Sequence, residues 1–273
     1  MVTPNKAGIC LTVDVEEWFH APDHPLGNDA DLWPALEPVL PVALPKTLAL
    51  LDRLGARATF FVLGWVAERY PDLVRSVSVA GHEVASHGWS HQRVDRMPPE
   101  AFRAEVRRSK RLLEVISGKR VLGFRAPCWS IGRDSWPYEI LAEEGFLYSS
   151  SRLPIPGLGG ARLAENASRK PIEFPALTRK IAGTACPAGG TVALRFMPEK
   201  WLRRAQDLRL ASGQTAVYWF HPWELVEEGP RLGGGPLFTW ARYTRLGILP
   251  KRLVALVPPG DRRIESLLGT PIH

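Results

Sequence analysis

The chain has 273 residues, 45% of them apolar, and a formal net charge of +7. This length and composition suffice for one substantial core. No run approaches the roughly 20 apolar residues of a membrane-spanning helix, and the N-terminal segment lacks the apolar stretch of a signal peptide. Three cysteines without C-x-x-C spacing indicate neither a disulfide framework nor a thiolate zinc site. We therefore expect a soluble, cytoplasmic protein with a single domain over residues 1–273.

Apolar and amphipathic segments alternate along the chain. Strands are predicted within 8–18, at 57–64, 82–87, 121–127 and 171–176, and within 215–225. Helices are predicted at 66–81, with a break near Pro71, and at 98–118, 134–146 and 198–213. Segments 152–170 and 181–192 are predicted loops. This alternation predicts an α/β fold with a largely parallel sheet, either open or closed into a barrel.

Positive charge is concentrated near the C-terminus. Between Arg231 and Arg263 there are seven Lys and Arg residues and only one acid, Asp261. We treat 226–273 as a basic C-terminal extension that could contact an anionic polymer or a membrane surface. A solvated basic face is the plainer alternative. No aromatic-interleaved basic motif is present, so no nucleic-acid partner is expected.

Polar residues cluster at the predicted C-terminal ends of the strands, where parallel α/β barrels place their catalytic groups. They are Asp14, Glu16, His87, His91, Arg125 and His221. Their coincidence at strand ends carries more weight than any one of them.

The first two acids and the two histidines suggest a metal site. Residues two apart on a strand point the same way, so Asp14 and Glu16 can both face the pocket while Glu17 points elsewhere. His87 and His91 can face one point if the chain turns helically there. One carboxylate and two imidazoles form a three-ligand site for a divalent metal. A solvated strand end and an accidental histidine spacing are the alternatives, and the spacer lacks the glutamate of an H-E-x-x-H protease.

Two further residues have both a catalytic and a structural interpretation. Arg125 follows a run that should be buried, where a guanidinium needs an acidic partner. It could orient Asp14 and keep it ionised, or it could form a structural salt bridge. His221, at a strand end, could protonate a leaving amine or could be a satisfied core histidine.

Taken in order, the motifs resemble those of the polysaccharide deacetylase superfamily with the NodB homology domain. "TVDVEE" stands where that family has T-F-D-D-G, and "SHGWSH" matches its H-[ST]-x-x-H motif with Gly88 in place of Ser or Thr. "FRAPCWS" matches R-x-P-[YW], and "YWFHPWEL" stands at the late histidine motif. More narrowly, "VDVEEWFH", "EFPA" and the basic C-terminal segment are similar to the subfamily encoded beside bacterial exopolysaccharide and exosortase systems.

The resemblance implies a distorted (β/α) barrel of about seven parallel strands and a divalent metal, with zinc the expected ion. It implies removal of N-acetyl groups from an amino-sugar polysaccharide or its precursor, in exopolysaccharide biosynthesis. The substrate partner would be an N-acetylated glycan. Two other functions stay open: hydrolysis of another linear or cyclic amide on the same fold, and a non-catalytic sugar-binding module.

The resemblance also implies roles for individual residues. Asp14 would be the general base, oriented by Arg125, and His221 the general acid. The metal ligands would be Glu16, His87 and His91. Glu16 is assigned by analogy, because Val15 occupies the position of the family's usual metal carboxylate, and the choice among Asp14, Glu16 and Glu17 stays open.

Substrate contacts are predicted in or beside the motifs, because aromatic faces suit the apolar faces of sugar rings. The predicted contacts are Trp89, Pro127, Trp129 and Trp223, and Trp219 lies close to them in the sequence. Ordinary core or rim packing is the alternative for each tryptophan.

Overall fold

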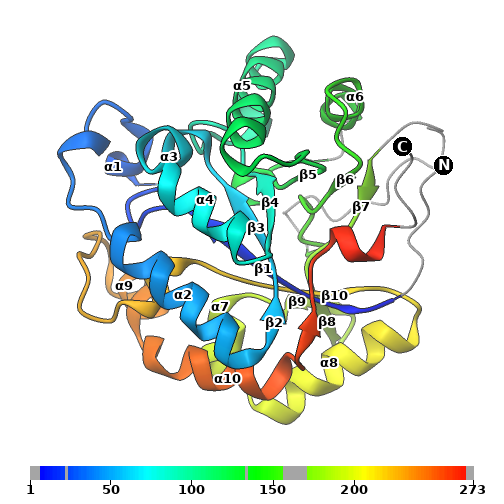
Figure 1. Cartoon of the computed structure of the whole chain (residues 1–273). Coiled ribbons are helices and arrows are strands. Elements are labelled where there is room, and N and C mark those ends of the chain that lie inside the picture. Colours follow the sequence, from blue (N-terminus) through cyan, green and yellow to red (C-terminus); the bar gives the residue numbers. More distant parts are fainter. Residues whose placement is uncertain (1–6, 22–23, 133–134, 156–170, 269–273) are drawn as a thin grey trace.

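The computed structural model describes residues 7–21, 24–132, 135–155 and 171–268. Figure 1 shows a curled sheet with helices packed around its outside. Across these four ranges, no helix is both long enough and apolar enough to cross a membrane.

Seven parallel strands form the main sheet, in the order β10-β1-β3-β4-β5-β6-β7. Their bounds are β1 Ile9–Val15, β3 Thr59–Val62, β4 Glu83–Ser86, β5 Gly123–Phe124, β6 Tyr148–Ser149, β7 Ile172–Glu173 and β10 Ala216–Phe220. The sheet curls until Ala176, just after β7, forms an isolated parallel bridge with Val217 of β10. The predicted distorted (β/α) barrel of about seven strands is therefore confirmed.

Helices connect the strands and cover the sheet (Figure 1). They are α1 Pro25–Asn28, α2 Leu40–Leu54, α3 Gly64–Arg69, α4 Pro71–Val79, α5 Pro99–Ser117, α6 Trp136–Glu143, α7 Thr191–Phe196, α8 Glu199–Ala211, α9 Pro236–Tyr243 and α10 Leu249–Leu256. Two small sheets add to them: β2 Ala56–Arg57 pairs in parallel with β11 Gly260–Asp261, and β8 Thr178–Ile181 forms an antiparallel hairpin with β9 Thr184–Pro187.

Alternation along β1 separates the main core from the barrel interior. Leu11, Val13 and Val15 join the large hydrophobic cluster between the sheet and the helices. Thr12 and Asp14 point to the opposite face, because successive side chains of a strand alternate. Burying the three apolar side chains against the helices therefore fixes Asp14 inside the barrel, at the strand end.

Two helix predictions agree well with the structure. The predicted helix 98–118 is α5, and it ends where Gly118 adopts a left-handed conformation with φ 67°. The predicted break near Pro71 separates α3 from α4. Proline suits the first turn of α4 because the N–H it lacks would have no partner within that helix.

The prediction of a loop over 181–192 is wrong. This segment contains β9 and the start of α7. Ala182 and Gly183 both have positive φ, 48° and 83°, and they join two strands in which Ile181 pairs with Thr184. A two-residue turn of this kind matches the twist of a hairpin. Of the other predicted loop, 152–170, only residues 152–155 lie among the described residues.

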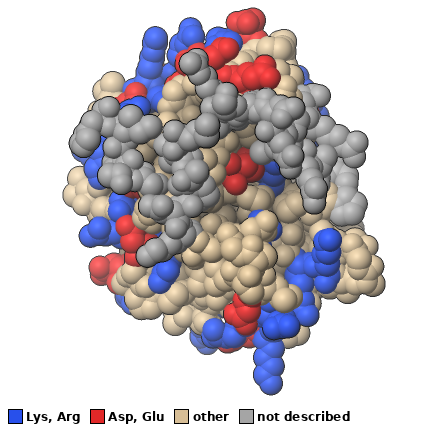
Figure 2. Space-filling view, turned by 90° about the vertical axis from the view of Figure 1, so that its right-hand side faces the viewer, with Lys and Arg blue, Asp and Glu red and all other residues tan. Residues whose placement is uncertain are grey.

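The basic C-terminal extension packs onto the barrel through apolar side chains. Leu249, Leu253 and Leu256 of α10 are buried in the main cluster. Tyr243 of α9 belongs to a second hydrophobic cluster, which also contains Trp18, three residues after the end of β1. Neither helix was predicted from the sequence. Figure 2 shows one face of the molecule, on which Lys and Arg side chains are scattered among Asp and Glu.

Candidate active site

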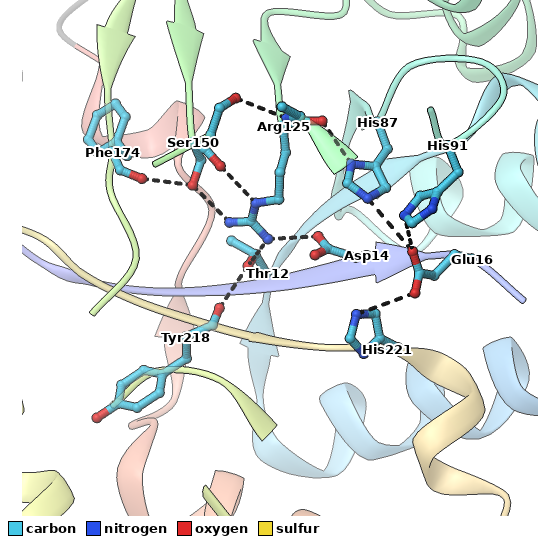
Figure 3. A network of polar contacts seen from close by, with 12 residues as sticks. Thr12, Asp14, Glu16, His87, His91, Arg125, Ser150, Phe174, Tyr218 and His221 are labelled. Carbon is cyan, nitrogen blue, oxygen red and sulfur yellow. Dashed lines mark hydrogen bonds and ion pairs between the residues drawn. The ribbon is translucent and has the colours of Figure 1, made fainter. Parts of the chain in front are cut away.

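Three predicted metal ligands meet at the C-terminal ends of β1 and β4. Glu16 Oε2 lies 2.6 Å from His91 Nε2 and 3.8 Å from His87 Nε2. The three potential ligand atoms lie within 4.8 Å of one another, and all three residues are buried. Figure 3 shows both imidazoles pointing at the Glu16 carboxylate. His87 Nδ1 lies 2.8 Å from the Arg125 carbonyl oxygen, which turns its Nε2 toward Glu16.

The two histidines converge through a turn and not through the helical turn expected from their spacing. Residues 87–91 are not helical, and Gly88 and His91 have positive φ values of 80° and 54°. Glu105 of α5 holds this turn, because its carboxylate accepts hydrogen bonds from the backbone N–H groups of Trp89 and Ser90. A left-handed residue at position 88 favours glycine, which explains the departure from Ser or Thr there.

The chemistry of these side chains fits a divalent cation. Burial by itself would raise the pKa of Glu16, but His91 and His221 outweigh it and hold that pKa below its usual range. Burial lowers the pKa of His87 to about 4, so its imidazole is neutral at pH 7 and has a lone pair to donate. One carboxylate and two imidazoles form a common donor set for zinc and for other divalent transition metals.

Asp14 and Arg125 form a buried ion pair beside this group. Arg125 Nη1 donates to Asp14 Oδ1 at 2.7 Å, and the two residues are 1% and 4% exposed. The same guanidinium donates to the Thr12 hydroxyl and to both oxygens of Ser150, its carbonyl and its hydroxyl. Four hydrogen bonds therefore fix the Arg125 guanidinium beside the Asp14 carboxylate, a position that suits both the orienting role and the structural salt bridge.

His221 approaches the group from β10, on the other side of Glu16 (Figure 3). Its Nε2 lies 3.5 Å from Glu16 Oε1, and its Nδ1 lies 3.0 Å from Glu224 Oε2. Burial lowers the pKa of His221, but Glu16 and Glu224 outweigh burial and raise it to about 9. The ring is thus held in a proton-carrying form. Glu224, in the 3₁₀ turn η4 Pro222–Leu225, was not among the predicted site residues although it lies three positions from His221.

These groups open into one cavity of about 290 Å³. Its lining residues are Asp14, Glu16, His20, Ala21, His24, His87, His91, Arg125, Ala126, Cys128, Trp129, Trp219, His221, Phe238 and Arg242. All six predicted catalytic and metal-binding residues therefore face one space. Seven lining residues were not named as candidates: His20, Ala21, His24, Ala126, Cys128, Phe238 and Arg242. Of these, Phe238 and Arg242 come from a segment far from the motifs in the sequence.

Of the four predicted substrate contacts, only Trp129 lines the cavity. It ends the 3₁₀ turn η3 Pro127–Trp129, in which Cys128 and Trp129 have positive φ values of 54° and 55°. Trp219, 8% exposed, lines the cavity beside it with ring centroids 4.8 Å apart. Two indole rings therefore form one wall of the cavity.

The other three predicted contacts do not line the cavity, and each of them is buried. The Trp89 ring packs against the backbone of Gly64, and the Arg108 guanidinium lies 3.4 Å above it. Trp223 is 4% exposed and belongs to the second hydrophobic cluster. Pro127 is buried where it starts η3. These three side chains pack beside the motif segments and thereby support the residues that line the cavity.

Glu17 is a structural residue. Its carboxylate accepts hydrogen bonds from the backbone N–H groups of Val39 and Leu40, at the start of α2. This position agrees with the strand geometry that directed Glu17 away from the pocket. His20, three residues on, does reach the cavity; its Nδ1 accepts from the Glu17 N–H, and its buried Nε2 has no partner among the described residues.

An α/β barrel with a buried carboxylate and two histidines at its strand ends is an arrangement typical of metal-dependent hydrolases. Comparison with known families gives a consistent result. Residues 31–143 match the family described as "Polysaccharide deacetylase", and residues 150–264 match a domain of unknown function, DUF3473. Residues 31–143, less than half of the chain, are thus similar to polysaccharide deacetylases.

Curated relatives share about 30% identity over part of the chain. A peptidoglycan deacetylase-like protein of Gibberella zeae is 32% identical over 112 residues, covering 40% of this chain and 32% of that protein. A peptidoglycan deacetylase of Helicobacter pylori is 30% identical over 110 residues, covering 40% of this chain and 37% of that protein. The matched part thus spans about a third of the length of these relatives.

Solved structures share the fold over nearly the whole chain. A Mycobacterium smegmatis protein assigned as a polysaccharide deacetylase has a TM-score of 0.57 at 23% identity, covering 96% of this chain and 87% of that one. A pseudoenzyme of the CE4 family from Bacillus anthracis has a TM-score of 0.52 at 15% identity, covering 97% of this chain and 66% of that one. Since the fold includes a pseudoenzyme, activity must be argued from the side chains of the site.

Proposed function

We propose that this protein is a metal-dependent hydrolase that removes N-acetyl groups from an amino-sugar-containing polysaccharide or its precursor. The observation that carries the proposal is the placement of the Asp14–Arg125 pair and His221 beside the Glu16, His87 and His91 group, within one cavity. A sugar-binding module needs neither an oriented carboxylate nor a proton-carrying imidazole. Both suit the cleavage of an amide, in which a base accepts a proton from water and an acid donates one to the leaving nitrogen.

Each side chain has a distinct part in the proposed reaction. A divalent metal held by Glu16, His87 and His91 would supply Lewis-acid polarisation of the acetamide carbonyl and of a water molecule. Asp14, whose Oδ1 is held by Arg125, accepts the water's proton. His221 donates a proton from Nε2 to the departing nitrogen, with Glu224 fixing the ring through Nδ1.

The products follow from the atoms exchanged. The amide C–N bond breaks, a C–O bond to water forms, and acetate and a free amino sugar leave the cavity. Trp129 and Trp219 provide an apolar wall for the faces of the sugar ring. The names of the curated relatives, which are peptidoglycan deacetylases or resemble them, support a glycan as the substrate. The sequence resemblance supports a place in exopolysaccharide biosynthesis.

Acetate release by the purified protein tests this proposal. Metal content and acetate release are measured on a panel of N-acetylated oligosaccharides, before and after treatment with a chelator and again after zinc is added back. We expect acetate release to be lost with the metal and restored by it, while circular dichroism shows that the fold persists. Unchanged turnover in metal-free protein contradicts the metal's role. Release of ammonia or ring opening from small amides would instead indicate a hydrolase of another linear or cyclic amide. Glycan binding without acetate release would indicate a non-catalytic sugar-binding module.

A further inference from the structure

One side of the cavity is formed by residues to which the proposed reaction assigns no part. His24, Phe238 and Arg242 line it, and we call these three residues the α9 subsite. Phe238 and Arg242 come from α9 in the basic C-terminal extension, and His24 precedes α1. The subsite is thus assembled from two segments more than 200 positions apart in the sequence.

Arg242 brings a positive charge to this side without an acidic partner. Its Nη2 donates a 2.7 Å hydrogen bond to the Trp18 carbonyl oxygen, and its guanidinium lies 4.4 Å from the centre of the Trp223 ring. Among the described residues, no carboxylate lies within 4.0 Å of it. Arg125, the other arginine in the cavity, is by contrast neutralised by Asp14 at 2.7 Å. Arg242 therefore keeps both its charge and the N–H donors of Nη1 available.

A second buried arginine adds to the positive potential. Arg195 of α7 is 1% exposed and donates to the carbonyl oxygens of Ala241 and Thr244, at the end of α9. Within the described chain it too has no carboxylate within 4.0 Å. Glu224 offsets part of the Arg195 charge, so the attraction of this side of the cavity for an anion depends mainly on Arg242.

His24 and Phe238 complete the subsite. His24 Nδ1 accepts a hydrogen bond from the Leu26 N–H, so a neutral ring carries its hydrogen on Nε2 and can donate it. The Phe238 ring is stacked on His24 with centroids 6.5 Å apart, and the Arg242 guanidinium lies 5.9 Å from the same ring. Phe238 is 38% exposed, which leaves part of an aromatic face free for a sugar ring.

The Trp223 ring lies between the α9 subsite and His221, the proposed general acid. The Trp223 ring is stacked on His221, with centroids 5.6 Å apart and planes 16° apart, and Arg242 packs against the same Trp223. A glycan whose acetamido group reaches His221 would extend a neighbouring substituent toward Arg242. The cavity therefore holds the proposed acid, His221, at one side and the positive charge of Arg242 at the other.

We propose that the α9 subsite binds an anionic substituent, a carboxylate or a phosphate, so that the substrate is an acidic N-acetylated glycan. This inference rests on the proposed deacetylase function and specifies its substrate class. A guanidinium with free donors binds carboxylates and phosphates through charge-assisted hydrogen bonds. Arg242 is then a residue that determines specificity, acting on binding and not on the chemical step.

Matched charged and neutral substrates test the proposal. A hyaluronan tetrasaccharide, which alternates N-acetylglucosamine with glucuronate, is compared with the same tetrasaccharide after reduction of its carboxyl groups. N-acetylglucosamine 1-phosphate is compared with methyl N-acetylglucosaminide, which separates phosphate from carboxylate as the source of the charge. We expect the wild-type protein to prefer the charged member of at least one pair, through KM and less so at high salt. No preference in either pair would overturn the proposal.

Variants show whether Arg242 causes that preference. Arg242→Gln should lower kcat/KM on the charged substrate by about 10- to 100-fold, mainly through KM, and leave the neutral substrate within about 2-fold. Arg242→Lys should retain part of the preference. Arg245→Gln, three residues on at an exposed position outside the cavity, is the matched control and should change neither value. Equal losses on both substrates in Arg242→Gln would contradict the proposal, because they would assign Arg242 the structural task of anchoring α9 to Trp18.

Binding measurements separate this inference from the deacetylase function. Calorimetry with the two tetrasaccharides requires no turnover. Preferential binding of the charged one, weakened in Arg242→Gln, would support the α9 subsite even if no acetate were released. Acetate release without any charge preference would support the enzyme and overturn the subsite.

Discussion

The Arg125 guanidinium donates a 2.7 Å hydrogen bond to Asp14 in a place where water reaches almost none of either side chain. The pair joins the ends of β5 and β1, which are not neighbours in the sheet. Removing two charges from water is costly, and here further hydrogen bonds from the guanidinium to Thr12 and Ser150 offset part of the cost. The pair therefore supports both the barrel and the orientation of the proposed base.

Replacing Arg125 should consequently lower both stability and activity. Arg125→Ala leaves the buried Asp14 carboxylate without its partner, and we expect the free energy of unfolding to fall by about 3–5 kcal/mol in urea titrations. Arg125→Lys keeps the charge and should fold well enough to show a reduced kcat. Arg75→Ala, which breaks the exposed pair with Asp72, is the control and should cost less than about 1 kcal/mol. A similar small cost at Arg125 would show that the buried pair is dispensable.

Glu224 should act through His221. His221→Ala is expected to lower kcat by about 10²–10⁴-fold at unchanged metal content. Glu224→Gln removes the charge that helps raise the pKa of His221 and should lower kcat by about 10-fold or more. The exposed Glu228→Gln variant is the control. If Glu224→Gln loses bound metal instead of turnover, Glu224 supports the ligands and not the acid.

Glu105 should matter for metal affinity although it lies outside the cavity. Its carboxylate holds the turn that aims His91, through the N–H groups of Trp89 and Ser90. Glu105→Ala should weaken zinc binding by about 10- to 100-fold, as measured by competition with a chromogenic chelator. Glu100→Ala, an exposed change on the same helix, should leave zinc affinity unaltered. Wild-type affinity in the Glu105 variant would mean that the turn holds its shape without this carboxylate.

Glu83, at the opposite end of β4, predicts a pH dependence of stability. Burial, together with the neighbouring Glu265, raises its pKa from 4.5 to about 7. Between these two pH values the folded protein keeps a proton that the unfolded chain releases, so this group's contribution to stability falls as the pH rises from about 4.5 to 7. The unfolding free energy of the wild type minus that of Glu83→Gln should therefore decrease as the pH rises from about 4.5 to 7. A pH-independent difference would exclude an elevated pKa at Glu83.

Local sequence patterns predicted a parallel α/β sheet and the six residues that meet at its strand ends, and the family resemblance added the distorted barrel. Alternation along β1 determines which face Asp14 occupies, and the strand ends bring His87, Arg125 and His221 together. Arg242 could not be found in this way, because it reaches the cavity only through the packing of α9 against Trp18. Trp223 was misplaced because its sequence neighbours do not reveal which face of η4 is buried. The cytoplasmic location and the exopolysaccharide role stay predictions.

The central claim is that Asp14 is the general base and that Glu16, two positions further on, is a metal ligand. Metal stoichiometry measured beside acetate release in Asp14→Asn and Glu16→Gln tests it most directly, since a base must accept a proton whereas a ligand must supply charge to a cation. We predict that Asp14→Asn keeps near-stoichiometric metal and loses most turnover, while Glu16→Gln loses metal first and regains partial activity at high zinc. An empty site in Asp14→Asn, with metal and rate both retained in Glu16→Gln, would contradict the account.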